Sequence, residues 1–232
     1  MSPDVLLSVM KVALFGGLVA ADETACGQFM ISRPLVAGFI TGLLTGNPLM
    51  GCALGALFEL LYIDVLPAGG SRFPSAGFAA VAAVSVFSYL GIDRLPDAGG
   101  FIPWLFLLSA LTATASGLLV VKERKANTRL LGIAVKAVKE GDFGKMERAH
   151  LSGVLVSLGR GGLTVLLVFA VVIPLRGLIE RTIALSGPRP EFLLVPYGAL
   201  GVSMVMRGFL SRGRFFHFVV GGLAALALLR FS

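Results

Sequence analysis

The chain has 232 residues, of which 56% are hydrophobic and 14% charged, and its mean hydropathy is +0.89. Soluble domains carry roughly 25% charged residues, so this composition excludes a disordered chain and argues against a water-soluble globule. The 20 lysines and arginines outnumber the 13 acidic residues and interrupt apolar runs, which favours the positive-inside rule over nucleic-acid binding. We therefore predict an all-α polytopic membrane protein that forms one domain over residues 1–232.

The first two apolar runs predict different kinds of helix. The run at 5–20 contains Lys11, whose ammonium group can snorkel to the membrane interface. The run at 35–66 is too long for one simple span, and Asn47-Pro48 interrupts it. Because proline disfavours helix at the residue before it, we predict two short helices that meet at Asn47, as in a re-entrant hairpin.

Several polar connections divide the rest of the chain. The further apolar segments are expected, in chain order, at 77–92, 101–121, 152–175, 192–206 and 215–229. The connections are a Gly/Pro-rich loop at 66–76, a polar turn at 93–100 and a polar stretch at 176–190. The segment 192–206 contains Pro196, Gly198 and Gly201, and 215–229 is marginal in length for a full crossing. The sequence therefore does not give the number of membrane crossings.

The segment 121–151 differs from its neighbours, because it holds eight of the 20 basic residues beside an apolar face. This pattern predicts an amphipathic helix on the membrane surface, followed by a turn at 141–144. A short loop that is this basic is expected on the cytoplasmic side. A calmodulin-like or nucleic-acid-binding segment is the alternative interpretation.

Ionisable side chains within apolar runs are functional candidates, because each costs a few kcal/mol to place in a bilayer. The candidates are Lys11, Glu59, Asp64, Arg72 and Arg160. Glu59 is the most informative, since apolar residues bracket it and a carboxylate accepts hydrogen bonds from sugar hydroxyl groups. Its alternative role is a structural ion pair with Arg33, Arg72 or Arg160.

Two amide side chains could also contact a polyhydroxyl ligand. Gln28 lies in the polar break before Arg33, and Asn47 lies at the apex of the expected hairpin. The alternative for Asn47 is a turn residue before proline, and Arg33 is expected to be structural.

Catalytic chemistry has little support in this sequence. Neither His150 nor His217 has a metal-ligand neighbour at helical spacing, and His150 is the one acid–base candidate. Cys26 and Cys52 form no metal spacing and are expected to act as small packing residues. We therefore expect no catalytic residues, no metal and no cofactor.

The residues from Gln28 to Ser75 resemble the IIC membrane component of the mannose/fructose/sorbose phosphotransferase system (PTS) family. The motifs are Gln28-x-Met30-x-x-Arg33-Pro34-Leu35, then Gly42-x-x-x-Gly46-Asn47, then Gly51-x-x-x-Gly55-x-x-Phe58-Glu59. The resemblance implies a multi-pass, oligomeric sugar permease of the bacterial inner membrane. It further implies a IID membrane partner and cytoplasmic IIA and IIB components, of which IIB phosphorylates the sugar. By position, Glu59 and Gln28 would face the sugar.

The chain departs from the family pattern at several polar positions. Gln28 and Asn47 stand where acids are common, Met30 where glutamine is usual, and Ser75 where the loop often ends in aspartate. These departures motivate a second hypothesis, a non-transporting regulatory or sensor relative that binds cytoplasmic PTS proteins. An unrelated channel or membrane scaffold is a third.

Overall fold

The computed structural model describes residues 3–63, 65 and 73–186, and within these residues the regular elements are all helices. They are α1 (Pro3–Thr24), α2 (Pro34–Thr45), α3 (Pro48–Leu61), α4 (Ala76–Leu90), the 3₁₀ helix η1 (Leu95–Phe101), α5 (Ile102–Lys139) and α6 (Phe143–Ser186). The expected segments at 192–206 and 215–229, together with Asp64, Arg72 and His217, lie outside the described residues.

Three helices of the described chain are long and apolar enough to cross a membrane, namely Pro3–Thr24, Asp97–Lys139 and Phe143–Leu185. Helix α1 has 22 residues and is therefore about 33 Å long, close to the ~30 Å hydrocarbon thickness of a bilayer. It packs along α6, where Gly16 lies against Gly161. Small residues of this kind allow helix backbones to approach closely in membranes.

Helices α2 and α3 form the hairpin that the sequence predicts at Asn47. Helix α2 ends at Gly46 in the left-handed conformation (φ 91°), and the Asn47 side chain caps α3 by accepting a hydrogen bond from the Met50 amide at 3.0 Å. The helices have 12 and 14 residues, so each is about 18–21 Å long and shorter than a bilayer crossing.

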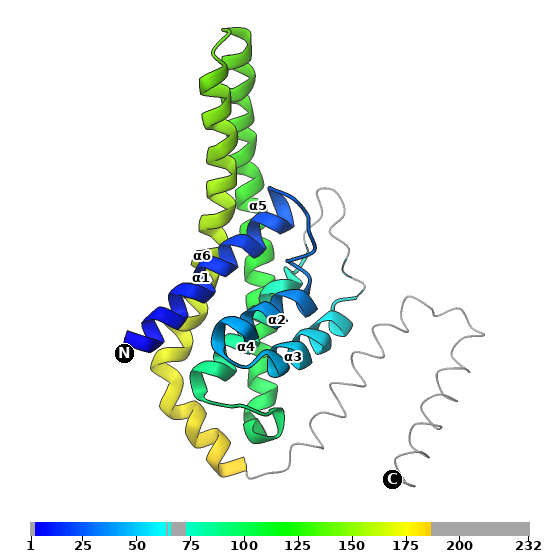
Figure 1. Ribbon diagram of the computed structural model, residues 1–232, viewed down its shortest axis with the longest axis vertical. Coiled ribbons are helices and arrows are strands. Elements are labelled where there is room, and N and C mark those ends of the chain that lie inside the picture. Colours follow the sequence, from blue (N-terminus) through cyan, green and yellow to red (C-terminus); the bar gives the residue numbers. More distant parts are fainter. Residues whose placement is uncertain (1–2, 64, 66–72, 187–232) are drawn as a thin grey trace, which may run out of the picture.

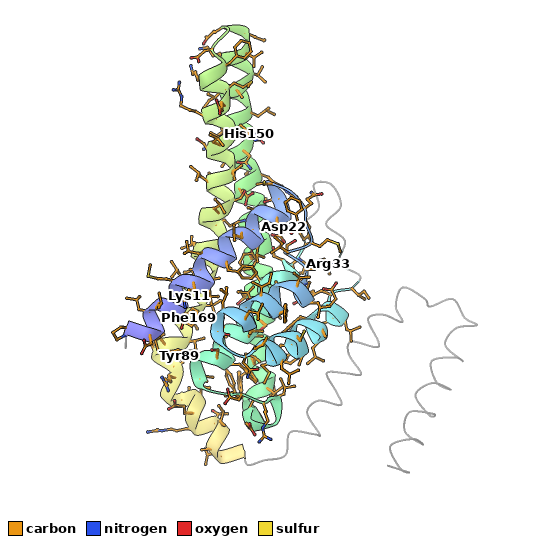
Figure 2. All side chains as sticks on the ribbon, viewed as in Figure 1. Lys11, Asp22, Arg33, Tyr89, His150 and Phe169 are labelled. Atoms are coloured by element: carbon orange, nitrogen blue, oxygen red, sulfur yellow. The ribbon has the colours of Figure 1, made fainter. Side chains whose placement is uncertain are left out.

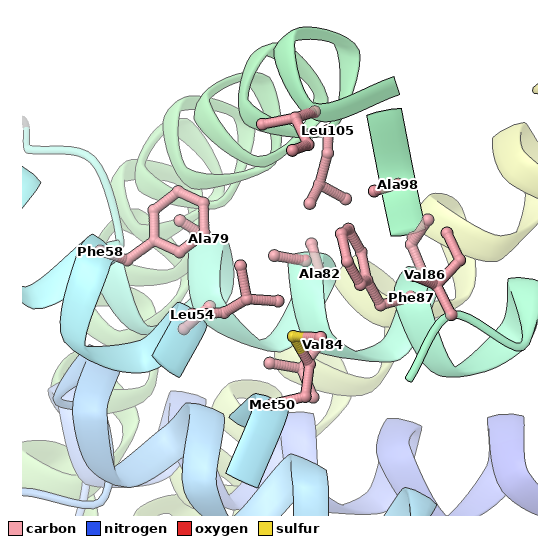
Figure 3. Close-up of a cluster of buried hydrophobic side chains, with 14 of the residues drawn as sticks. Met50, Leu54, Phe58, Ala79, Ala82, Val84, Val86, Phe87, Ala98 and Leu105 are labelled. Carbon is pink, nitrogen blue, oxygen red and sulfur yellow. The ribbon is translucent and has the colours of Figure 1, made fainter. Parts of the chain in front are cut away.

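Helix α4 is the centre of the bundle. Every residue from Gly77 to Phe87 is buried, because α2, α3, α5 and α6 all pack against it. Figure 3 shows Leu54 and Phe58 of α3 and Leu105 of α5 converging on the side chains of α4. Because protein surrounds α4 on all sides, its sequence is apolar on every face of the helix.

The prediction of a separate amphipathic surface helix at 121–151 is wrong in its boundaries. Helix α5 continues without a break to Lys139, and α6 begins at Phe143, so the segment forms the outer end of a long helical hairpin. This part of the molecule, residues 122–155, is called the projecting hairpin, and Figure 1 shows it standing clear of the bundle. Its two helices pack against each other through the small buried residues Ala137 and Ala149. The charged side chains lie mostly on the exposed sides of the two helices.

The expected polar connection at 176–190 is also wrong in part, since α6 stays helical through Ser186. Pro174 lies inside this helix without ending it. An exposed pair between Arg176 and Glu180, one turn apart at 2.7 Å, supports the helix in this polar stretch.

Candidate functional site

Glu59 joins the open ends of the α2–α3 hairpin. Its carboxylate pairs with Arg33 across 2.8 Å and also accepts a hydrogen bond from the Leu35 amide at 3.2 Å. The second contact places a negative charge at the start of α2, where the helix dipole favours it. The pair with Arg33 is one of the roles that the sequence left open for Glu59.

A small pocket of about 60 Å³ lies beside this pair and contains polar groups from three segments of the chain. We call it the Glu59 pocket, and its polar lining residues are Glu23, Ser32, Arg33, Glu59 and Tyr62. Burial raises the pKa of Tyr62 above the ordinary value of a phenol, so its hydroxyl stays protonated and can donate a hydrogen bond. The pocket therefore offers carboxylate acceptors beside guanidinium and hydroxyl donors.

The loop that precedes Arg33 is held by a buried carboxylate. Asp22 accepts hydrogen bonds from the Phe29 amide, from the Ser32 amide at 2.8 Å and from the Ser32 hydroxyl at 2.7 Å. Within this loop, Gln28 and Met30 adopt positive φ angles of 52° and 68°, which are uncommon for residues other than glycine. The Asp22 contacts stabilise this conformation and so position Ser32 and Arg33 at the pocket.

Loss of the Asp22 carboxylate should loosen this loop. In Asp22→Ala, the amides of Phe29 and Ser32 lose their charged acceptor, and each such bond contributes about 1.5–3 kcal/mol. We expect these amides to exchange hydrogen at least about tenfold faster, as measured by mass spectrometry. Asp97→Ala, which removes an exposed pair with Arg94, is the control and should leave the loop unchanged. Equal exchange in both variants would contradict the role given to Asp22.

A cluster of buried charges lies behind the Glu59 pocket, where α1, α5 and α6 meet. The Arg160 guanidinium pairs with Glu123 through Nε and with Glu23 through Nη2, the latter at 3.1 Å. It also donates to the Ser116 hydroxyl at 3.0 Å and to a backbone carbonyl of α1. We call Glu23, Glu123 and Arg160 the Arg160 cluster.

Glu23 belongs to both sites. Glu123 is fully surrounded, because it accepts from Thr24, Ser157 and Arg160. Glu23 instead lines the Glu59 pocket while it pairs with Arg160. Both carboxylates of the cluster therefore pair with the buried guanidinium, and Glu23 also lines the pocket.

The family to which this chain belongs follows from its sequence. The profile of a family described as "PTS system sorbose-specific iic component" matches residues 6–232. The chain is a member of this PTS IIC family. It is 25% identical to a curated protein, the "PTS system sorbose-specific EIIC component" of Klebsiella pneumoniae, over 97% of this chain and 84% of that protein. The resemblance found in the sequence is therefore confirmed.

Two solved structures share the fold of this IIC component. One, titled "Structure of membrane protein", aligns with a TM-score of 0.69 over 97% of this chain and 87% of that chain. The other, titled "CryoEM Structure of Mannose Transporter ManYZ and Microcin E492 (MceA) complex", aligns with a TM-score of 0.59 and the same coverage. Each is 18% identical to this chain, so the likeness supports the all-α membrane fold.

The residues that the sequence singled out do not all meet in this IIC component. Figure 2 shows Asp22 and Arg33 near the base of the projecting hairpin, with His150 further out on it and Lys11 well away from both. Gln28 is exposed on the loop and is not among the residues that line the Glu59 pocket. His150 lines a different pocket, and Cys26 and Cys52 are free thiols. Arg160 is buried in its cluster, and Asn47 caps α3.

Three residues at or behind the pocket were not predicted from the sequence, namely Asp22, Glu23 and Tyr62. The sequence does offer an indication for the two acids, because they lie at the end of the apolar run that forms α1. Tyr62 gave no such signal, since a tyrosine at the end of an apolar helix is an ordinary interfacial residue.

Proposed function

We propose that this chain is the sugar-translocating subunit of a mannose-family PTS permease. In this proposal a hexose-like sugar binds at the Glu59 pocket and is phosphorylated by a separate cytoplasmic IIB component. The observation that supports it most directly is the meeting of Glu59, Arg33, Glu23 and Tyr62 around one pocket. Paired acceptors and donors of this kind suit the hydroxyl groups of a neutral sugar.

The size of the pocket limits how the sugar can bind. A volume of about 60 Å³ has room for a few water molecules, well below the roughly 300 Å³ of ordinary ligand pockets. The hydroxyl edge of a sugar fits such a space, and a whole ring requires the pocket to widen. Gln28 stands on the loop that leads to Ser32, and we propose it as a contact at the entrance.

The partners follow from the same proposal. A IID membrane subunit would complete an oligomeric complex in the bacterial inner membrane, and IIA and IIB would act from the cytoplasm. The eight basic residues of 121–151 support a cytoplasmic position for the projecting hairpin, by the positive-inside rule. The Glu59 pocket would then lie toward the cytoplasm, because the loop after α1 and the base of the hairpin lie on the same side (Figure 2).

Uptake of labelled hexoses by cells that express the chain with its neighbouring PTS genes tests this function. We expect wild-type uptake of L-sorbose or D-mannose, and a fall of about tenfold to a hundredfold in Glu59→Ala, because hydrogen bonds to a charged group contribute about 1.5–3 kcal/mol. The side chains of Arg33 and Glu59 are 39% and 23% exposed, so breaking their pair should cost little stability. Unchanged thermal unfolding would therefore separate a binding defect from a folding defect.

Glu180→Ala is the matched control, since it removes an exposed glutamate that also pairs with an arginine one turn away. It should leave uptake unchanged. Full uptake in Glu59→Ala would refute the assignment of the site. No uptake by the wild type, in a complex that is inserted and assembled, would favour the non-transporting regulatory relative.

A further inference from the structure

Two pockets that share lining residues lie at the end of the bundle that is away from the Glu59 pocket. One, of about 140 Å³, lies between α1, the end of α2, α4 and α6, and its lining includes Asp4, Ser8, Ser88 and Tyr89. The other, of about 150 Å³, lies at the apex of the α2–α3 hairpin and is lined mainly by polar atoms. Both are lined by Thr45 and Ser88, and we call them the outer pockets.

A weak hydrogen bond joins the two residues that line both outer pockets. The Ser88 hydroxyl donates to the carbonyl oxygen of Thr45 across 3.3 Å, which is long for a bond of this type. A turn of the Ser88 side chain would break this contact. Together the two spaces come close to the roughly 300 Å³ at which ordinary small-molecule pockets begin.

The chemistry of the outer pockets suits a neutral polyhydroxyl ring. The Asp4 carboxylate and the Ser8 hydroxyl lie one helical turn apart on α1, and both line the first pocket. Tyr89 contributes a phenol whose ring packs edge-on against Phe169, with centroids 6.0 Å apart. Figure 2 shows these two rings side by side. A carboxylate and hydroxyls can bind sugar hydroxyl groups.

Other ligand classes fit less well. A divalent cation needs several oxygen ligands with negative charge, and the linings of the two outer pockets together hold two carboxylates, Asp4 and Asp93. An anion would need a free cation, but the guanidinium of Arg176 lies over the Tyr89 ring and pairs with Glu180.

The outer pockets and the Glu59 pocket lie at opposite ends of α1. Asp4 lines the first and Glu23 the second, and the 19 helical steps between them correspond to about 28 Å. This separation is close to the hydrocarbon thickness of a bilayer. If the projecting hairpin is cytoplasmic, the outer pockets face the opposite side of the membrane.

We propose that the outer pockets form a second sugar site, which receives the sugar before it reaches the Glu59 pocket. This inference rests on the proposed function, because it assumes that the chain translocates a sugar. It adds a site of initial contact that uses Asp4, Ser8, Ser88 and Tyr89. The sugar would then pass along the α2–α3 hairpin, whose two ends contribute to the two sites.

Protection of an introduced cysteine tests this site in the full complex. Ser8→Cys is made in a Cys26→Ser, Cys52→Ala background, and intact cells are treated with a membrane-impermeant maleimide. L-Sorbose and D-mannose are the probes, and sucrose is the osmotic control. At sugar concentrations about ten times the dissociation constant, labelling should slow by about tenfold. Asp97→Cys, exposed on η1 outside both pockets, should be labelled at the same rate with and without sugar.

The same experiment with Glu59→Gln separates the two sites. Protection of Ser8→Cys that persists with Glu59→Gln supports a second site. Protection that disappears with Glu59→Gln means that sugar acts from the Glu59 pocket, which overturns the second site but not the permease. A Ser8→Cys that is not labelled, or not protected in a complex that still takes up sugar, also overturns the second site. Uptake that does not depend on Glu59 would instead count against the proposed function.

Discussion

Replacing Arg160 by methionine is expected to cause the largest loss of stability among single substitutions in the described chain. The guanidinium pairs with two carboxylates, and the side chains of Arg160 and Glu123 are only 5% and 2% exposed. Its removal leaves the carboxyl groups of Glu123 and Glu23 buried without their cation. Breaking a buried pair in this way costs about 3–5 kcal/mol. Thermal unfolding of the purified protein and its yield on size-exclusion chromatography would both fall.

Two comparison variants make this prediction specific. Arg129→Met makes the same substitution at an exposed arginine of α5, and it should change the free energy of unfolding by no more than about 0.5 kcal/mol. Adding Glu123→Met to Arg160→Met removes the more deeply buried of the two orphaned carboxylates and should recover part of the lost stability. If the double variant were as unstable as Arg160→Met, simple loss of packing would explain the effect better than the unpaired charge.

Substituting Gly51 by alanine is expected to open the α2–α3 hairpin and reduce uptake strongly. A methyl group at this position would overlap the carbonyl oxygen of Gly38 on the facing helix, and one at Gly38 would lie 2.7 Å from the carbonyl oxygen of Gly51. Neither backbone can move aside without separating the helices. Overpacking of this kind costs about 1–3 kcal/mol, and here it would displace Glu59 from Arg33. Thermal unfolding and hexose uptake are the measurements.

Gly132→Ala is the matched control for this substitution. Apart from its own helix, no atom lies within 4 Å of a methyl group built at Gly132, which is exposed in the last third of α5. Since glycine weakens a helix interior, the alanine should stabilise the protein by up to about 1 kcal/mol. Similar unfolding temperatures for Gly51→Ala and Gly132→Ala would contradict the close contact between α2 and α3.

Local signals in the sequence were sufficient for much of the fold. Asn47-Pro48 inside a long apolar run predicted the hairpin. A capping side chain followed by a proline starts a new helix, and both effects depend only on neighbouring residues. The composition predicted the membrane class for a similar reason, since the energetic cost of charge in a bilayer applies to each residue separately. The cost of charge in a bilayer also made Glu59 a candidate, and an ion pair with Arg33 was one of its predicted roles.

The limits of helices α5 and α6 were harder to predict. The charged stretch after Val121 reads as a separate surface helix, yet α5 runs through it because α6 returns along it and buries Ala137. Whether a helix ends or continues in such a stretch depends on a partner that lies elsewhere in the sequence. Packing against that partner, rather than local propensity, provides most of the stability of such a helix.

The sequence by itself determined that this protein is helical, resides in a membrane and belongs to the PTS IIC family. It did so because hydropathy, proline signals and glycine spacing are properties of short stretches. The tertiary structure alone decided which charges meet. Arg160 lies 137 residues from Glu23 and 37 from Glu123, and no local pattern relates them. The position of Glu23 between the Arg160 cluster and the Glu59 pocket likewise arises only when α1 packs against both α6 and the α2–α3 hairpin, because side-chain partners are chosen by proximity in space.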